Sequence, residues 1–151
     1  MLSGSEAAIS DVWHCWDKGF SGLVVYVTNF RLIETWLKSQ YTDPESAEVE
    51  ELSWASNKLI DMALDDPEAL WTIIPDILKY DSTDRITGAL GAGLLEDLVV
   101  HHGKKFIDRI VSLSEVNPAF KKSMTFTFID ENDVSPADYE KFTRAAANEA
   151  R

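Results

Sequence analysis

Four dipeptides in this chain join a helix-capping residue to a proline: Asp43-Pro44, Asp66-Pro67, Asn117-Pro118 and Ser135-Pro136. A side-chain oxygen at the N-cap followed by proline at the first helical position is the local signature of a helix start. Three of these prolines are followed within a turn by an acidic residue that offsets the helix dipole, namely Glu45, Glu68 and Asp138. Four such starts in one chain predict an all-α fold.

The segments around these starts carry apolar residues at helical spacing, in the stretches 9–16, 26–37, 49–62, 106–111 and 139–146. Two other stretches have strand-like composition, Leu23–Thr28 and Met124–Ile129. Because two such strands would have to pair across most of the chain, we expect a helix for the first. For the second we expect a helix end that runs into extended chain. Pro75 lies inside an apolar run and predicts a kinked or split helix there.

The length of 151 residues and the apolar content of 45% fit one domain that spans residues 1–151. The predicted architecture is a single compact bundle of about seven helices. No apolar stretch is long enough to span a membrane, and we expect no secretion signal at the N-terminus. Cys15 is the only cysteine, so no disulfide can form within the chain. These features favour a cytoplasmic protein.

The net charge of −12 is distributed unevenly. Residues 43–97 contain fourteen acidic and three basic residues, which leaves eleven excess negative charges in that part of the chain. Residues 101–122 reverse the sign, with five Lys or Arg against two acidic residues. Such a field repels nucleic acid and anionic membranes and attracts cationic partners. We therefore expect a basic protein partner, and neither direct nucleic-acid binding nor membrane binding.

The stretch from Leu90 to Gly103 concentrates glycines, two carboxylates and two histidines in fourteen residues. On a helical wheel His102 falls in the middle of the apolar face, which predicts a core histidine bonded to a buried group such as a backbone carbonyl. Asp97 and His101 stand at i and i+4 and predict a local pair. Glu96 is expected in the first turn of the helix, where it offsets the dipole.

The glycines of this stretch do not follow the order of a dinucleotide-binding fingerprint, and the next turn carries Glu96 and Asp97, which would repel phosphate. We expect Gly91 and Gly93 to end one helix, turn the chain and let two helices approach closely.

Asp97 and His101 are also the weak candidates for a metal site, because a carboxylate and an imidazole at i, i+4 can share one ion. Nothing in the sequence marks a third ligand. Cys15 and His14 are neighbours that face apart on a helix, so no nucleophile–base pair is predicted. No catalytic residue and no cofactor is assigned, and an enzyme is the less favoured class.

Trp54 stands apart from the other tryptophans, because it lies off the apolar stripe that Leu52 and Leu59 mark and close to acidic residues. An exposed aromatic side chain beside carboxylates is a suitable anchor for a basic surface. The candidate partner-binding residues are therefore Glu45, Glu48, Glu50, Glu51, Trp54, Asp61 and Asp65.

The order of Gly91, Gly93, Leu95, Glu96, Asp97 and Leu98, followed by His102-Gly103, by Phe106–Arg109 and by Asn117–Phe120, resembles a family of small bacterial proteins of unknown function. The resemblance covers roughly residues 66–128. It implies that Gly91, Gly93, Glu96, Asp97 and His102 form the shared feature, and it implies no known activity, substrate or cofactor. The family's Asp-Pro step is Asn117-Pro118 in this chain.

These observations favour a small acidic helical protein that occludes a basic partner. An immunity protein for an antibacterial toxin, or an inhibitor of a nucleic-acid-handling protein, is the concrete form of this hypothesis. One alternative is a metal-binding protein or enzyme that uses Glu96, Asp97, His101 and His102. A second alternative is a homo-oligomeric scaffold, in which the basic stretch 104–122 of one copy meets the acidic part of another. Whether the acidic face is functional or only solubilising stays open at this point.

Overall fold

The computed structural model describes the backbone of residues 21–147 and the side chains of residues 29–147. The helices within this range are α2 (Ser21–Tyr41), α3 (Glu48–Asp65), α4 (Pro67–Tyr80), α5 (Asp84–Ala89), the π-helical turn η1 (Leu90–Leu95), α6 (Glu96–Val116), α7 (Pro118–Met124) and α8 (Pro136–Ala147). The described residues contain no strand, which confirms the predicted all-α fold. The apolar stripe at 9–16, with His14 and Cys15, lies outside the described residues.

Three of the four predicted helix starts are confirmed. The Asp66 carboxylate accepts from the backbone N–H of Ala69 at 3.3 Å and begins α4. The Asn117 side chain accepts from Phe120 N–H at 3.0 Å and begins α7. Ser135 Oγ accepts from Asp138 N–H at 3.2 Å at the start of α8. Each bond satisfies a backbone donor that the first turn leaves without a partner.

The fourth predicted start, at Asp43-Pro44, is wrong. Asp43 Oδ1 accepts from Glu45 N–H at 2.9 Å, and the Asp43 carbonyl accepts from Ser46 N–H at 2.9 Å. These bonds close a turn of the Asx type, which the same two residue types also favour. Helix α3 begins only at Glu48.

The second strand-like stretch follows the prediction in part, because α7 ends at Met124 and no strand follows within the described residues, but a turn at Thr125 and Phe126 precedes chain without regular secondary structure. Leu23–Thr28 is helical and belongs to α2, also as predicted. Of the predicted kink or split at Pro75, the split is wrong, because α4 runs through this proline without a break. Buried Ile73, Ile74 and Ile77 hold both halves of α4 in the core, so packing there outweighs the lost backbone hydrogen bond.

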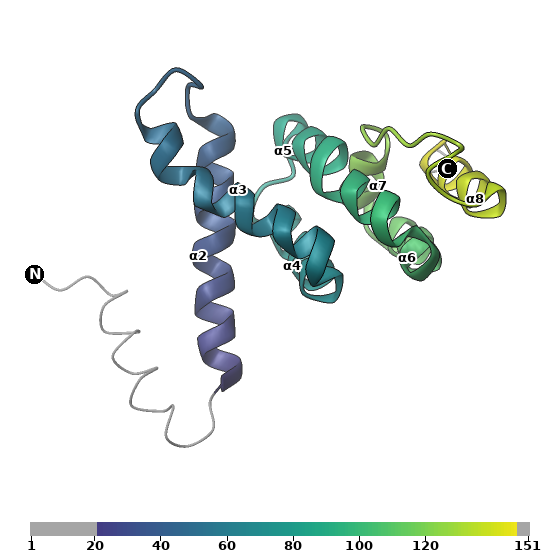
Figure 1. Ribbon diagram of the computed structural model, residues 1–151, viewed down its shortest axis with the longest axis horizontal. Coiled ribbons are helices and arrows are strands. Elements are labelled where there is room, and N and C mark those ends of the chain that lie inside the picture. Colours follow the sequence, from purple (N-terminus) through teal and green to yellow (C-terminus); the bar gives the residue numbers. More distant parts are fainter. Residues whose placement is uncertain (1–20, 148–151) are drawn as a thin grey trace, which may run out of the picture.

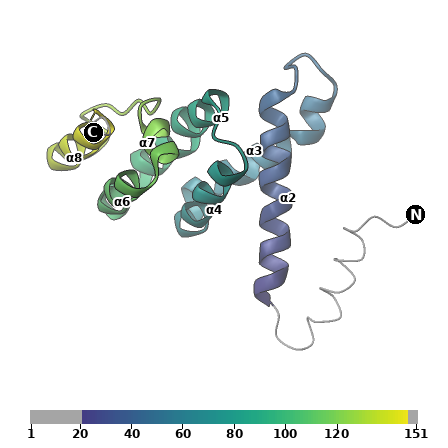
Figure 2. The same cartoon turned by 180° about the vertical axis from the view of Figure 1, so that it is seen from behind.

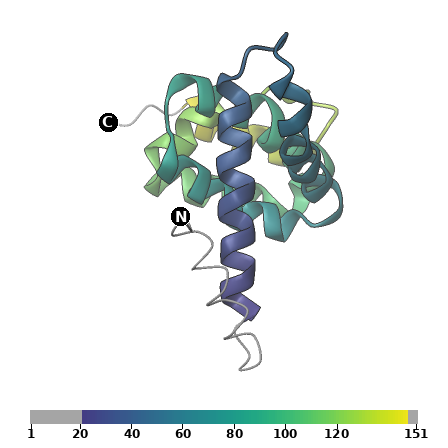
Figure 3. The ribbon, with the colours of Figure 1, turned by 90° about the vertical axis from the view of Figure 1, so that its left-hand side faces the viewer.

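The helices follow one another across the molecule, from α2 at one end to α8 at the other (Figure 1). Helix α3 crosses α2, and α6 contacts α3, α7 and α8. Figure 2 shows the same succession from behind. In the view from the α2 end, the other helices stand behind the upper part of α2 (Figure 3).

The core is built almost entirely from aliphatic side chains and three fully buried phenylalanines, Phe106, Phe120 and Phe142. They come from α6, α7 and α8, so the core joins these three helices. Burying each such ring stabilises the fold by about 2–3 kcal/mol. Among the described residues, no helix is both long enough and apolar enough to cross a membrane.

Candidate functional site

The glycine-rich segment does not end a helix, contrary to the prediction. Helix α5, the π-helical turn η1 and α6 form one continuous helical path from Asp84 to Val116. The two glycines of η1 differ in their surroundings. A Cβ atom on Gly91 would lie 2.0 Å from the carbonyl oxygen of Ser123 in α7, whereas a Cβ on Gly93 would meet nothing within 4 Å. The expected close approach of two helices is therefore confirmed at Gly91 alone.

Glu96 has a different role from the one predicted. Because the helix passes through this position without a break, Glu96 caps no helix start. Its Oε2 instead accepts from the backbone N–H of Phe128 at 3.2 Å. Phe128 belongs to the chain after α7 that has no regular secondary structure, so Glu96 ties that segment to α6.

His102 marks a kink in α6, where its φ of −136° and ψ of 20° leave the helical region. Its Nε2 donates to the carbonyl oxygen of Leu64 at 3.1 Å, which confirms the predicted bond to a backbone carbonyl. Leu64 lies in the last turn of α3, where carbonyls lack helical partners. The ring is half-buried rather than central in the core, because the kink turns it away from the position that a straight wheel predicts.

Gly103 follows the kink and allows a second close contact. A Cβ at this position would lie 2.9 Å from Cγ1 of Val134. Val134 belongs to the segment that leads into α8. At this point of α6, His102 thus contacts the end of α3, and Gly103 contacts the segment that leads into α8.

The predicted pair of Asp97 and His101 does not form. None of the ion pairs or hydrogen bonds among the described side chains joins these two residues. His101 is exposed, and Asp97 is half-buried. The part of the chain that the structure describes holds no group of three or more His, Cys, Asp or Glu side chains arranged to bind a metal ion.

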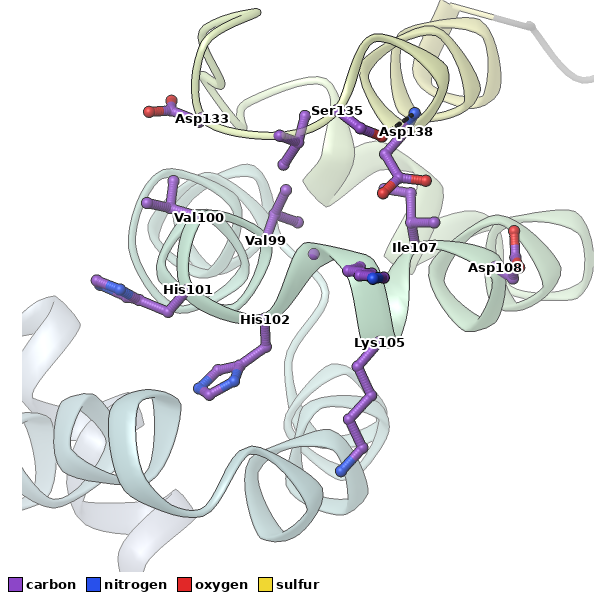
Figure 4. A pocket seen from close by; sticks show the side chains of 13 residues that line it. Val99, Val100, His101, His102, Lys105, Ile107, Asp108, Asp133, Ser135 and Asp138 are labelled. Carbon is purple, nitrogen blue, oxygen red and sulfur yellow. Dashed lines mark hydrogen bonds between the residues drawn. The ribbon is translucent and has the colours of Figure 1, made fainter.

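A pocket of about 770 Å³ lies beside the kink, between α6 and the segment that leads into α8 (Figure 4). Several of its polar groups already have partners within the fold. Lys105 pairs with Glu68 at 3.2 Å, and Asp108 pairs with Lys141 at 3.0 Å. Ser135, the hydroxyl of this pocket, accepts the capping bond at the start of α8. The pocket therefore follows from the kink, and its chemistry supports helix packing.

Sequence analysis missed an ionic cluster between α4 and α6. Both terminal nitrogens of the Arg109 guanidinium, Nη1 and Nη2, donate to the Glu68 carboxylate, at 2.8 and 3.0 Å. The hydrogen bonds from Arg109 and Lys105 lower the pKa of Glu68 to about 2. The Arg109 guanidinium also stacks near the rings of Phe106 and Trp71, at 4.7 and 5.4 Å from their centroids. In the sequence, the one indication of this cluster is the i, i+4 spacing of Lys105 and Arg109.

The structure divides the candidate partner-binding residues into two groups. Glu45 lies in the turn before α3, and Glu48 and Glu51 lie in its first turn. Glu50, Trp54, Asp61 and Asp65 follow one another along the side of α3 that faces away from buried Ala55, Leu59 and Met62. All seven are exposed. None of the six carboxylates forms an ion pair with a described side chain.

Trp54 is 42% exposed and lies among these carboxylates, as its position off the apolar stripe predicts. The guanidinium carbon of Arg31, in α2, lies 6.0 Å from the centroid of the Trp54 ring. This separation is at the outer limit of a cation–π contact. Two large apolar side chains of the same helix, Ile60 and Leu64, are each 43% exposed. We use the term α3 face for Glu50, Trp54, Asp61, Leu64 and Asp65.

The chain belongs to a family of unknown function (DUF6869), whose model matches residues 42–146. The matched range runs from the turn before α3 nearly to the end of α8, so it includes the α3 face as well as the segment 91–103. It also extends beyond the range 66–128 over which the sequence resembles an uncharacterised family. No curated protein and no solved structure matches the chain.

Proposed function

We propose that this chain is a binding protein that takes up a basic protein partner on the α3 face. The observation that carries the proposal is the exposed Trp54 ring among carboxylates that have no ionic partner in the described structure. Aromatic side chains are enriched at the energetic centres of protein interfaces. Unpaired charges around such a ring attract and orient a partner of opposite sign.

The concrete form of the proposal is an immunity protein for an antibacterial toxin, or an inhibitor of a protein that handles nucleic acid. Proteins that bind nucleic acid carry basic surfaces. An acidic protein with a net charge of −12 can cover such a surface and compete with the nucleic acid. Its association would be fast and would slow as salt screens the two fields.

The pairing of charges within the fold argues against self-association of acidic and basic regions. In the basic stretch 104–122, Lys105 and Arg109 already contact Glu68. Lys122 likewise pairs with Asp84. Three of the five basic residues of this stretch are thus engaged within one copy, while the carboxylates of the α3 face are not. A basic surface on another protein is the better complement.

The test is affinity capture of the tagged full chain from a lysate of the organism that encodes it, at low and at high salt, with mass spectrometry of the eluate. A Glu50→Gln/Asp61→Asn variant removes two charges from the α3 face. A Glu115→Gln/Glu131→Gln variant removes two charges from exposed positions on α6 and in the loop before α8, and it is the matched control.

We expect the wild-type chain and the control to retain one stoichiometric basic protein at low salt and to lose it at high salt. The α3 variant should retain much less of it at low salt. Equal capture by both variants would contradict the proposed face. A partner whose capture does not depend on salt would contradict the electrostatic basis of the proposal.

A further inference from the structure

The α3 face belongs to an exposed strip along one side of the helix. Glu50, Trp54, Asn57, Asp61 and Leu64 are all exposed and follow one another at alternating steps of four and three residues. Side chains at this spacing form a seam along one side of a helix over several turns. At 1.5 Å per residue the seam is about 21 Å long. A helical segment of a partner can therefore contact the whole seam at once.

The chemistry of the seam specifies what this partner helix carries. Glu50 and Asp61 lie on either side of Trp54 along the seam, one turn before it and two turns after it. Leu64, with Ile60 beside it, adds an apolar end where each side chain is 43% exposed. The complement is an amphipathic helix with basic residues opposite the carboxylates and apolar residues opposite Leu64.

At the centre of the seam, the Trp54 ring already has a guanidinium group near it. Arg31 reaches over from α2, with its guanidinium carbon 6.0 Å from the ring centroid. A guanidinium is planar and weakly hydrated, so it stacks on an aromatic face better than an ammonium group does. Arg31 thus brings a guanidinium group to the outer limit of a cation–π distance from the Trp54 ring within this chain.

We infer that the partner lays an amphipathic helix along the α3 face and places an arginine over Trp54, in the position that Arg31 occupies in the free chain. This inference rests on the proposed function and adds to it the secondary structure of the partner and the residue type at the centre of the contact. Arg31 then acts as an internal competitor for the ring. Removing its guanidinium strengthens binding of the partner's arginine.

Two synthetic helical peptides test the inference directly. Each is roughly 16 residues long, enough to span the seam at 1.5 Å per residue. Both carry leucines on one face and lysines opposite the carboxylates, and they differ only at the position opposite Trp54, which is arginine in one peptide and lysine in the other. Fluorescence anisotropy of the labelled peptides gives the Kd for the full wild-type chain and for the variants Trp54→Ala, Arg31→Gln and Lys38→Gln. Lys38 is an exposed residue of α2, so its variant controls for the lost positive charge.

The wild-type chain should bind the arginine peptide about two-fold more tightly than the lysine peptide, because both cations contact the ring and a whole exposed cation–π contact is worth no more than about five-fold. Trp54→Ala should abolish that preference. Arg31→Gln should tighten binding of the arginine peptide more than Lys38→Gln does.

Equal affinity for the two peptides, or a preference that survives in Trp54→Ala, would overturn the inference and leave the proposed function standing. Failure of both peptides to bind would also overturn the inference, and the capture experiment decides the proposed function separately. Peptide binding that is unchanged in Glu50→Gln/Asp61→Asn, measured in the same way, would also overturn the inference.

Discussion

Single residues between positions 91 and 103 act as contact points for different neighbours of one helical path. Gly91 admits the backbone of α7, and Glu96 holds the N–H of Phe128. His102 satisfies a carbonyl at the end of α3, and Gly103 admits Val134. These contacts explain why glycines, a carboxylate and a histidine stand together without a shared chemical task. They support a structural role for this segment.

The two glycines of η1 provide a matched pair for testing that role. Gly91→Ala should destabilise the fold by about 3 kcal/mol, because its methyl group would overlap the Ser123 carbonyl and force the helices apart. Gly93→Ala should stabilise the fold by about 0.5–1 kcal/mol, because its methyl group meets no atom and alanine favours the helix. Urea unfolding followed by circular dichroism measures both changes. Equal effects of the two substitutions would contradict the assigned role of Gly91.

At the scale of secondary-structure elements, most helix starts could be predicted from the residues next to them. Asp66, Asn117 and Ser135 begin helices as predicted, because an N-cap bond depends on neighbours within three residues. Asp43 has the same local sequence signature and closes a turn instead. The difference is that α3 begins only at Glu48, further along the chain than a cap at Asp43 requires. A capping motif does not encode that distance.

The features that sequence analysis missed depend on contacts between distant elements. The π-helical turn and the kink at His102 occur where α7, α3 and Val134 press on one helix. A helical wheel assumes a straight helix, so it placed His102 in the core. The face of α3 could be predicted, because its exposed residues follow from helical spacing alone. Its Arg31 contact could not, because Arg31 and Trp54 lie on different helices.

The contact between α4 and α6 predicts how stability responds to acid. The folded-state pKa of Glu68 is lowered from 4.5 to about 2 by its bonds to Arg109 and Lys105. A carboxylate with a lowered pKa stabilises the fold above its unfolded pKa, and that stabilisation is lost as the pH falls toward the folded pKa. The difference in Tm between the wild-type chain and Glu68→Gln should therefore be present at pH 6 and shrink as the pH falls from about 4.5 to about 2.

Thermal unfolding at several pH values between these limits measures the effect. Arg109→Gln removes the same contact by deleting the guanidinium group instead of the carboxylate. The difference in Tm between this variant and the wild-type chain should shrink over the same pH range. A Tm difference between wild type and Glu68→Gln that stays constant over this range would contradict the assigned contact.

At the scale of the whole molecule, charges are used in two ways. On α4 and α6 they pair within the fold and connect elements, as Glu68 and Arg109 do. On the α3 face they have no ionic partner among the described side chains and surround an exposed aromatic ring. Acids that only solubilise a protein need no such ring. The contacts of the segment 91–103 are structural, and the α3 face is where we propose that a partner is recognised.

The most direct test of this assignment measures partner capture and the free energy of unfolding side by side on two variants. Glu50→Gln/Asp61→Asn should lose most of the captured partner, while its unfolding free energy changes by no more than about 0.5 kcal/mol. Gly91→Ala should lose stability and still capture the partner at a temperature where it remains folded. Full capture by the first variant, together with loss of capture by the folded second variant, would move recognition from the α3 face to the segment 91–103 and contradict the account.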